Sequence, residues 1–258
     1  MTLADKYLDH AFELLQRLRE TQMENIDRAA ELIAQAYVDG HTFYAWGGPH
    51  SSLPVQDIFE RAGGSPIVNL VITPGLSYED GPIKIGTQLE RLEGYGRAFF
   101  AHIGAEAGDV ILLVSTSGRN PFPVEMAMAA KEAGLKVIGM TSLAYSQAVT
   151  SRHSSGTKMY EYCDIILDNL TEPGDASIAD ERLPQKVGPT SGWMGIIILQ
   201  TLMVAVAEHL LAKGVTPPIY LAGNVDRDEQ YKQALTELIK KYRTPFGGIY
   251  SPMRDRGR

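Results

Sequence analysis

The sequence holds one cysteine, Cys163, among its 258 residues. A lone cysteine cannot form an internal disulfide, the usual staple of small secreted domains. The first twenty residues carry Asp5, Asp9 and Glu13 and lack the basic-then-apolar order of a signal peptide. We therefore expect a cytoplasmic protein.

Positive charge is also scarce, since 24 Lys and Arg residues face 31 Asp and Glu residues, for a formal net charge of −7. No run of basic residues is long enough to follow a phosphate backbone, so we expect no nucleic-acid partner. A small anionic ligand stays compatible with this charge, because a nest of backbone amides is locally positive inside a negative protein.

Several motifs of cofactor chemistry are missing. The chain has neither a Walker pattern nor G-x-G-x-x-G, and its six histidines show no pair at metal-ligand spacing. We therefore expect no nucleotide, no other cofactor and no metal. The one long apolar run, residues 192–207, is short for a membrane span and is typical of a buried core or interface helix, so no membrane partner is expected.

What the sequence does contain is an alternation of strand and helix patterns, which favours an α/β fold with a doubly wound, mostly parallel five-stranded sheet flanked by helices. The chain is predicted to form a single domain over 1–258, with a core at about 30–225, an N-terminal helical segment over 1–39 and a C-terminal helix at about 226–243. The expected strands cover 41–46, 66–72, 109–114, 135–140 and 164–167. Helices are expected over 53–62, 86–103 and 192–213, and from the Ser/Thr/Gly loop after the third strand to Gly134. Loops are expected over 74–81 and 173–188.

Three loops follow strands or precede helices and are rich in hydroxyls and glycine. Ligands of open parallel sheets bind beyond the carboxyl ends of the strands, and helix amino termini favour anions. Helix capping alone explains one Ser or Thr in each loop, whereas three consecutive hydroxyl residues before Gly118 favour an anion site. The candidate binding residues are Gly48, Ser51, Ser52, Ser115, Thr116, Ser117, Gly118, Asn120, Thr190 and Ser191.

The run DVILLVSTSGRNPFPVEMAMAAKEAGLKVIGMTS resembles the centre of the sugar isomerase (SIS) domain, found in phosphoheptose isomerase and N-acetylmuramic acid 6-phosphate etherase. The resemblance implies that Ser115, Thr116, Ser117 and Asn120 hold a substrate phosphate. The runs YEYCDIILDN and EPGDA are similar to a bacterial group of uncharacterised SIS-domain proteins.

Two glutamates extend the resemblance to the etherase branch. Glu60 in DIFE and Glu93 in RLEG match glutamates that are catalytic there, and His50 is a further candidate for opening the sugar ring or protonating O1. Metal-dependent phosphoheptose isomerases have a histidine where this chain has Gln56, which disfavours a metal.

The resemblance implies an aldose–ketose isomerase that acts on a sugar phosphate, or on a similarly anionic sugar, by carboxylate-mediated proton transfer. A phosphosugar lyase of the muramic acid phosphate type and a non-catalytic sugar-phosphate sensor stay open as alternatives. It also implies a homodimer or homotetramer with sites between subunits.

Overall fold

The computed structural model describes residues 1–77, 82–224, 226 and 228–242, and its centre is a five-stranded sheet. All pairings in this sheet are parallel, in the order β2-β1-β3-β4-β5. The predicted fold class is therefore confirmed. The strands are β1 (Phe43–Gly47), β2 (Val68–Val71), β3 (Val110–Val114), β4 (Lys136–Thr141) and β5 (Ile165–Asp168).

The two central strands are apolar along their whole length because both of their faces are covered. Every residue of β1 and of β3 is buried. This is the pattern of a parallel sheet with helices on both sides. The chain leaves β1 toward β2 on one side and returns to β3 on the other, so the strand order reverses at β1. Ligands bind at such a reversal in open α/β sheets.

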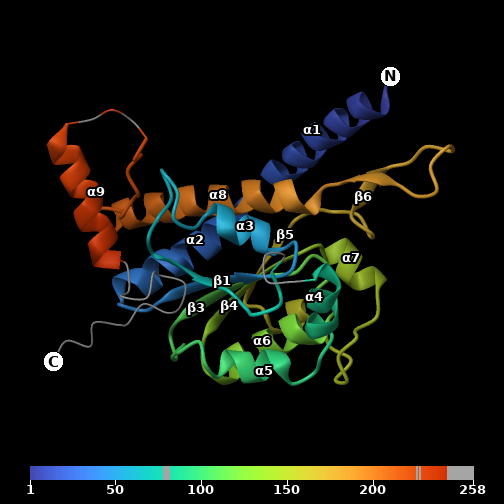
Figure 1. Cartoon of the computed structure of the whole chain (residues 1–258), viewed down its shortest axis with the longest axis horizontal. Coiled ribbons are helices and arrows are strands. Elements are labelled where there is room, and N and C mark those ends of the chain that lie inside the picture. The colour runs from blue at the N-terminus through green and yellow to red at the C-terminus, as the bar shows by residue number, and fades with distance from the viewer. Residues whose placement is uncertain (78–81, 225, 227, 243–258) are drawn as a thin grey trace.

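One face of the sheet is covered by α2 (Met23–Val38), α3 (Ser52–Asp57) and α8 (Ser191–Ala212), with α1 (Leu3–Thr21) leading away from them (Figure 1). Ala29, Ala30 and Ala34 of α2 are fully buried, and such small side chains let helices approach closely. α8 is long and apolar enough to span a membrane by length and composition. In this fold it is a core helix whose buried residues include Met194, Ile198, Leu202 and Val206.

The opposite face carries α4 (Ile83–Glu90), α5 (Tyr95–Phe100), α6 (Pro121–Glu132) and the short 3₁₀ helix η2 (Met159–Tyr162), while α7 (Leu143–Ala148) follows β4. Phe122 of α6 is the centre of this second core. Its ring centroid lies 5.0 Å from that of Trp46 in β1 and 5.2 Å from that of Tyr95 in α5. Aromatic packing thus joins α5 and α6 to the sheet.

The segment predicted as a loop over 173–188 contains a two-stranded antiparallel ribbon, β6 (Ala176–Ile178) and β7 (Val187–Pro189), which corrects that prediction. The ribbon is joined to α1, because the Tyr7 hydroxyl donates to the Pro189 carbonyl at 2.6 Å and accepts from Trp193 Nε1 at 2.8 Å. A turn-rich polar sequence gave no sign of these tertiary contacts.

Two predicted helices are wrong in length. The helix expected over 53–62 ends at Asp57, because Gly63 and Gly64 form backbone hydrogen bonds with Tyr220 and draw the chain away. The helix expected over 86–103 is two helices, α4 and α5, separated at Gly94, whose φ of 89° is left-handed. Glycine adopts this conformation without steric cost.

The predicted terminal helices have these bounds in the structure. The segment 1–39 forms the two helices α1 and α2, and the C-terminal helix is α9 (Glu229–Tyr242). Residue 225, the end of the predicted core, and residues 227 and 243 of the predicted C-terminal helix lie outside the described residues. The same is true of residues 78–81 at the end of the predicted loop over 74–81.

The contact of α8 with α3 can be tested at Gly195. A Cβ at this position would meet Pro54 Cγ at 2.7 Å and Met140 Cε at 3.0 Å. Gly195→Val should therefore lower the free energy of unfolding by about 1–3 kcal/mol, as overpacking does elsewhere. Urea denaturation measures the change. Gly192→Val, in the same helix but with no atom within 4 Å of its Cβ, should leave stability unchanged or slightly raised; equal losses in both variants would contradict the packing argument.

Candidate functional site

The loops after β1 and β3 lie side by side at the carboxyl edge of the sheet. The strands pair in parallel with Gly47 opposite Val114, so residues 47–52 and 115–120 leave the sheet at the same level. Adjacent strands are about 4.8 Å apart, so the two loops border one site. In Figure 1 this edge lies on the side of α4 and α7.

The loop Ser115–Asn120, here called the anion loop, is held in shape from outside. Ser115 N donates to the Met140 carbonyl at 3.0 Å, and the Thr116 carbonyl accepts from Ser142 N at 2.9 Å and from Thr141 Oγ1 at 3.0 Å. Gly118 has a φ of 57°, which favours glycine at the turn into α6. The neighbouring strand β4 and its extension therefore fix the backbone of the loop.

The polar groups of the anion loop are left available. Among the described residues, the hydroxyls of Ser115, Thr116 and Ser117 have no hydrogen-bond partner, although Ser115 is only 4% exposed. The loop leads into α6, a twelve-residue helix whose amino terminus carries partial positive charge. The hydroxyl donors and the positive end of the helix dipole together form a cradle for an anion with several acceptor oxygens.

The loop after β1 is more tightly packed. Gly48 is buried and followed by a cis peptide bond to Pro49, and a Cβ at Gly48 would meet the Leu76 carbonyl at 3.2 Å. Ser52 is buried and its hydroxyl donates to the Pro49 carbonyl at 2.6 Å. Ser51 is half-buried and His50 is exposed at the rim.

A cavity of about 370 Å³ lies between this loop and the end of β2. Four uncharged polar side chains line it beside an apolar wall. Its lining includes Gly47, Ser52, Gln56, Phe59, Thr73 and Ser77. No ionisable side chain is among the described residues that line it.

The third hydroxyl loop also reaches this edge, but its amides are occupied. Thr190 N and Ser191 N donate to Asp175 Oδ1 at 3.0 and 2.8 Å, and the Ser191 hydroxyl donates to Asp175 Oδ2 at 2.7 Å. Asp175 thus caps the start of α8 with its own negative charge. Buried Thr190 approaches Thr171 at 3.4 Å, which joins the start of α8 to the segment after β5.

The two glutamates predicted as catalytic lie outside the anion loop. Glu60 is exposed, has a left-handed φ of 34°, and follows the end of α3 on the crossover toward β2. Glu93 is exposed just before α5, and its Oε1 accepts from Ser154 N at 2.6 Å. This hydrogen bond lowers the pKa of Glu93. The catalytic role of both residues stays a prediction.

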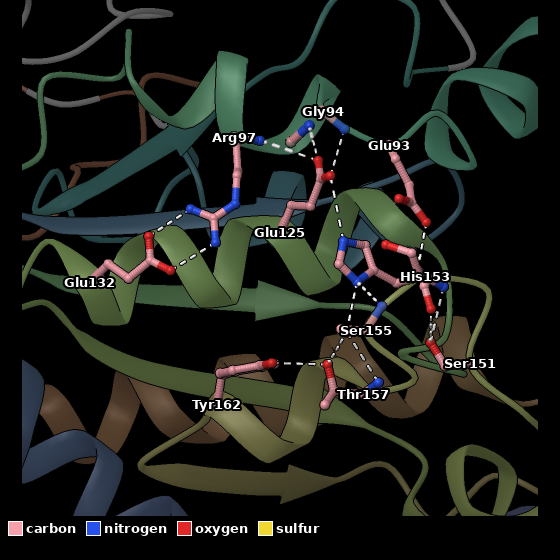
Figure 2. A network of polar contacts seen from close by, with 12 residues as sticks. Glu93, Gly94, Arg97, Glu125, Glu132, Ser151, His153, Ser155, Thr157 and Tyr162 are labelled. Carbon is pink, nitrogen blue, oxygen red and sulfur yellow. Dashed lines mark hydrogen bonds and ion pairs between the residues drawn. The ribbon is translucent and has the colours of Figure 1, made fainter.

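A polar network explains why the helix breaks beside Glu93 (Figure 2). Glu125 of α6 is 3% exposed, and its carboxylate accepts from Gly94 N at 2.5 Å and from Gly96 N at 2.8 Å. These are orphan donors at the start of α5, so a carboxylate from another helix caps it. His153 Nε2 lies 3.6 Å from Glu125 Oε1, while Nδ1 accepts from Ser155 N at 3.2 Å.

The sequence prediction missed one buried carboxyl close to the anion loop. Glu90, the last residue of α4, is 8% exposed, and it lies near enough to Asn120 for that side chain to lower its pKa. Burial raises the pKa of Glu90 to about 7, although Asn120, Arg91 and Arg152 act in the opposite direction. Desolvation disfavours the charged form, and here it outweighs the nearby positive charge.

Two arginines, Arg91 and Arg152, act on this carboxyl, and a third, Arg119, lies close to Arg152. Arg152 N donates to the Arg119 carbonyl at 2.8 Å, and Arg152 Nη1 donates to Asn120 Oδ1 at 2.9 Å. Partial desolvation lowers the pKa of Arg152, and repulsion from Arg119 and Arg91 lowers it further. The anion loop therefore has a positive rim in a protein whose formal net charge is −7.

A family model describes this chain over much of its length. The model of the SIS domain matches residues 6–142, more than half of the chain. The chain belongs to the SIS domain family. This confirms the family indicated by the residues around the anion loop, which lies inside the matched region.

Relatives of this SIS-domain protein are similar over nearly its full length. A UPF0309 protein of Shouchella clausii is 36% identical over 240 residues, 93% of this chain and 98% of the relative. A UPF0309 protein of Streptomyces avermitilis is 41% identical over 225 residues, 87% and 90% of the two chains. Among solved structures, a phosphoheptose isomerase from Neisseria gonorrhoeae is similar with a TM-score of 0.52 and 19% identity, covering 80% of this chain and 100% of that one. This likeness shows the shared fold.

Glu90 of this SIS-domain protein offers a direct test of burial. Its folded pKa of about 7 lies above the ordinary 4.5, so its contribution to stability is fully present below pH 4.5 and is lost as the pH rises toward and through 7. Relative to Glu90→Gln, the wild type should lose about 3 kcal/mol of unfolding free energy across that window. Urea denaturation at pH 4 to 8 measures the difference.

Glu93→Gln provides the contrast, because the pKa of Glu93 is lowered. The stability that Glu93 contributes is present above its ordinary pKa and is lost as the pH falls through the folded pKa. The wild type and Glu93→Gln should therefore differ by the same amount from pH 5 to 8. A difference between wild type and Glu90→Gln that is flat over this range would show that Glu90 titrates normally.

Proposed function

We propose that this protein binds a sugar phosphate, or a similarly anionic sugar, and interconverts its aldose and ketose forms. The observation that carries the proposal is the anion loop, where three adjacent hydroxyls precede the amino terminus of α6 and have no hydrogen-bond partner within the part of the chain that the structure describes. The hydroxyl donors and the helix dipole both favour a tetrahedral anion. Membership of the SIS domain family supports the same ligand class.

The surroundings of the anion loop suit the rest of a sugar. The cavity of about 370 Å³ is lined by Gly47 and Ser52, which flank the loop after β1, next to the anion loop. The polar side chains that line it are uncharged. Hydroxyl and amide groups such as those of Ser52, Thr73 and Gln56 can exchange hydrogen bonds with sugar hydroxyls. The phosphate would lie at β3 and the sugar would extend toward β2.

Isomerisation of a sugar requires correctly positioned acid and base groups. Removal of the proton beside the carbonyl needs a base, and the resulting enediolate needs a hydrogen-bond donor. Elimination from a sugar begins with the same proton removal, so a lyase acting on the same class of sugar is the neighbouring alternative. Neither reaction requires a metal or an organic cofactor.

We also propose that the protein forms a homo-oligomer in the cytoplasm. Large apolar side chains are exposed on α1 and α8, with Phe12 68% and Val204 70% exposed. Leu8 lies one turn before Phe12 on α1 and is 58% exposed, and Leu211 lies two turns after Val204 on α8 and is 63% exposed. Exposed apolar patches of this kind mark interaction surfaces in soluble proteins.

Ser117→Asp tests the binding proposal. A carboxylate in the anion loop should repel a phosphate by several kcal/mol, which corresponds to a loss of at least about 100-fold in affinity. Isothermal titration with glucose 6-phosphate, fructose 6-phosphate and sedoheptulose 7-phosphate measures binding. Thr236→Asp adds the same charge at an exposed position on α9 and should leave affinity unchanged.

Isomerisation by the wild type should incorporate deuterium from D₂O at C1 or C2 of the bound sugar, as detected by NMR. Binding without exchange for every sugar phosphate tried would leave a sensor rather than an isomerase. Undiminished affinity in Ser117→Asp would remove the anion loop from the binding site.

A further inference from the structure

We propose that Arg119 is a further anion-binding residue of this site, whose guanidinium donates to the anionic group of the ligand and makes the site prefer a doubly charged group to a singly charged one. The inference rests on the proposed function and adds a residue and a selectivity to it. Neither the pattern of hydroxyls nor the family resemblance gives Arg119 a role, so the inference is drawn from the hydrogen bonds, burial and charges around it.

Two side-chain polar atoms of the described residues are shielded from solvent and have no hydrogen-bond partner, Arg119 Nε and Ser146 Oγ. Both border the anion loop. Arg119 belongs to it, and Ser146 Oγ lies 3.5 Å from the position that a Cβ on Gly118 would occupy. Shielded polar groups in native proteins are nearly always paired, and each exception needs an explanation. The turn at Gly118 and Arg119 therefore offers donors for which the described protein supplies no acceptor.

The guanidinium of Arg119 is held beside its own loop. Its Nη2 donates to Thr150 Oγ1 at 3.2 Å, and the Arg119 carbonyl accepts from Arg152 N at 2.8 Å. The side chain and the backbone of Arg119 thus contact the same short segment after α7. The bond to Thr150 uses one of the five N–H groups of the guanidinium. The planar fork that remains, Nε included, matches the oxygens of a phosphate or carboxylate group.

The positive charge of Arg119 is not balanced by a neighbouring carboxylate. Arg152 lies alongside and donates from Nη1 to Asn120 Oδ1 at 2.9 Å, so the hydrogen bonds of both guanidiniums go to neutral oxygens. No carboxylate of the described residues lies within 4.0 Å of either guanidinium. Glu90 acts on Arg152 from farther away, and burial raises the pKa of Glu90 to about 7, so near neutral pH it cancels that charge only in part. Two positive charges beside the hydroxyls favour a dianion over a monoanion.

Charge is the property by which Arg119 and Arg152 can distinguish anions of the same shape. A phosphate monoester carries about two negative charges at pH 8, because its second pKa is about 6, whereas a sulfate ester of the same tetrahedral shape carries one. The hydroxyls of residues 115–117 can bond the oxygens of either ester. The preference for the dianion is therefore the part of recognition that the two arginines add.

Paired ligands test the proposal on the full chain. Isothermal titration at pH 8 compares glucose 6-phosphate with glucose 6-sulfate, and methyl phosphate with methyl sulfate, which carry the anion without a sugar. The wild type should bind the phosphate esters about 10- to 100-fold more tightly, the range of one hydrogen bond to a charged group. Arg119→Gln should lose most of this preference, because the phosphate affinity falls while the sulfate affinity changes less. Arg182→Gln removes one positive charge at an exposed pair with Asp180 and should keep the wild-type preference.

A purely structural role for Arg119 predicts a different pattern. If Arg119 only tied the segment after α7 to the anion loop, Arg119→Gln would lower the urea midpoint of the ligand-free protein and would weaken both kinds of ester alike. We expect an unchanged midpoint without ligand, because the substitution removes a shielded donor that has no partner in the described protein. Urea denaturation of the ligand-free variant and wild type measures this.

The two proposals fail in different ways. A wild type that binds both esters equally, an Arg119→Gln protein that keeps the wild-type preference, or a lowered midpoint with equal losses for both esters overturns the role of Arg119 and leaves the proposed function standing. A wild type that binds neither methyl phosphate nor any sugar phosphate would instead contradict the proposed function, and the present inference would fall with it.

Discussion

The parallel pairing of β1 with β3 is the constraint on which the site depends. Because Gly47 lies opposite Val114, the buried glycine turn after β1 and the hydroxyl turn after β3 emerge at one level. The strands can remain wholly apolar because α2, α3 and α8 cover one face and α5 and α6 the other. Polar side chains are consequently confined to the strand ends, where the sheet has no covering layer.

A second constraint comes from buried carboxyl groups that serve the backbone. Glu125 accepts hydrogen bonds from Gly94, Gly96 and Arg97 and so starts α5 afresh. Without this cap and the left-handed Gly94, α4 could continue as one helix, and Glu90 would not be its last residue. The network of Figure 2 therefore affects the candidate site indirectly, because it determines where α4 ends and α5 begins, with Glu93 between them.

The features predicted from the sequence are those that depend on local pattern. Runs such as VILLV identify central strands because no alternation is possible when both faces are buried. The anion loop was also predictable, because three hydroxyl residues followed by glycine are more than a helix cap requires. The residues missed depend on contacts between distant parts of the chain. Arg152 reaches Asn120 across 32 positions, and the break at Gly94 needs Glu125, 31 positions away.

Burial of a glutamate is equally invisible in a motif. Glu90 and Glu93 stand in the segment LERLEG, where each directly follows a leucine. The motif matches Glu93, and only tertiary packing distinguishes a carboxyl enclosed against Asn120 from one exposed beside Ser154. A match between short motifs thus identifies the region of a candidate site more securely than it identifies the environment of each group within it.

The charge of Glu90 also bears on how an anion could be held here at all. A permanently ionised carboxylate beside Asn120 would oppose a dianion in the anion loop, whereas three arginines favour it. Burial raises the pKa of Glu90 to about 7, which weakens this opposition near neutral pH because the protonated carboxyl carries no charge. The arginine rim and the raised pKa of the buried carboxyl therefore act in the same direction, since both favour an anion at this loop.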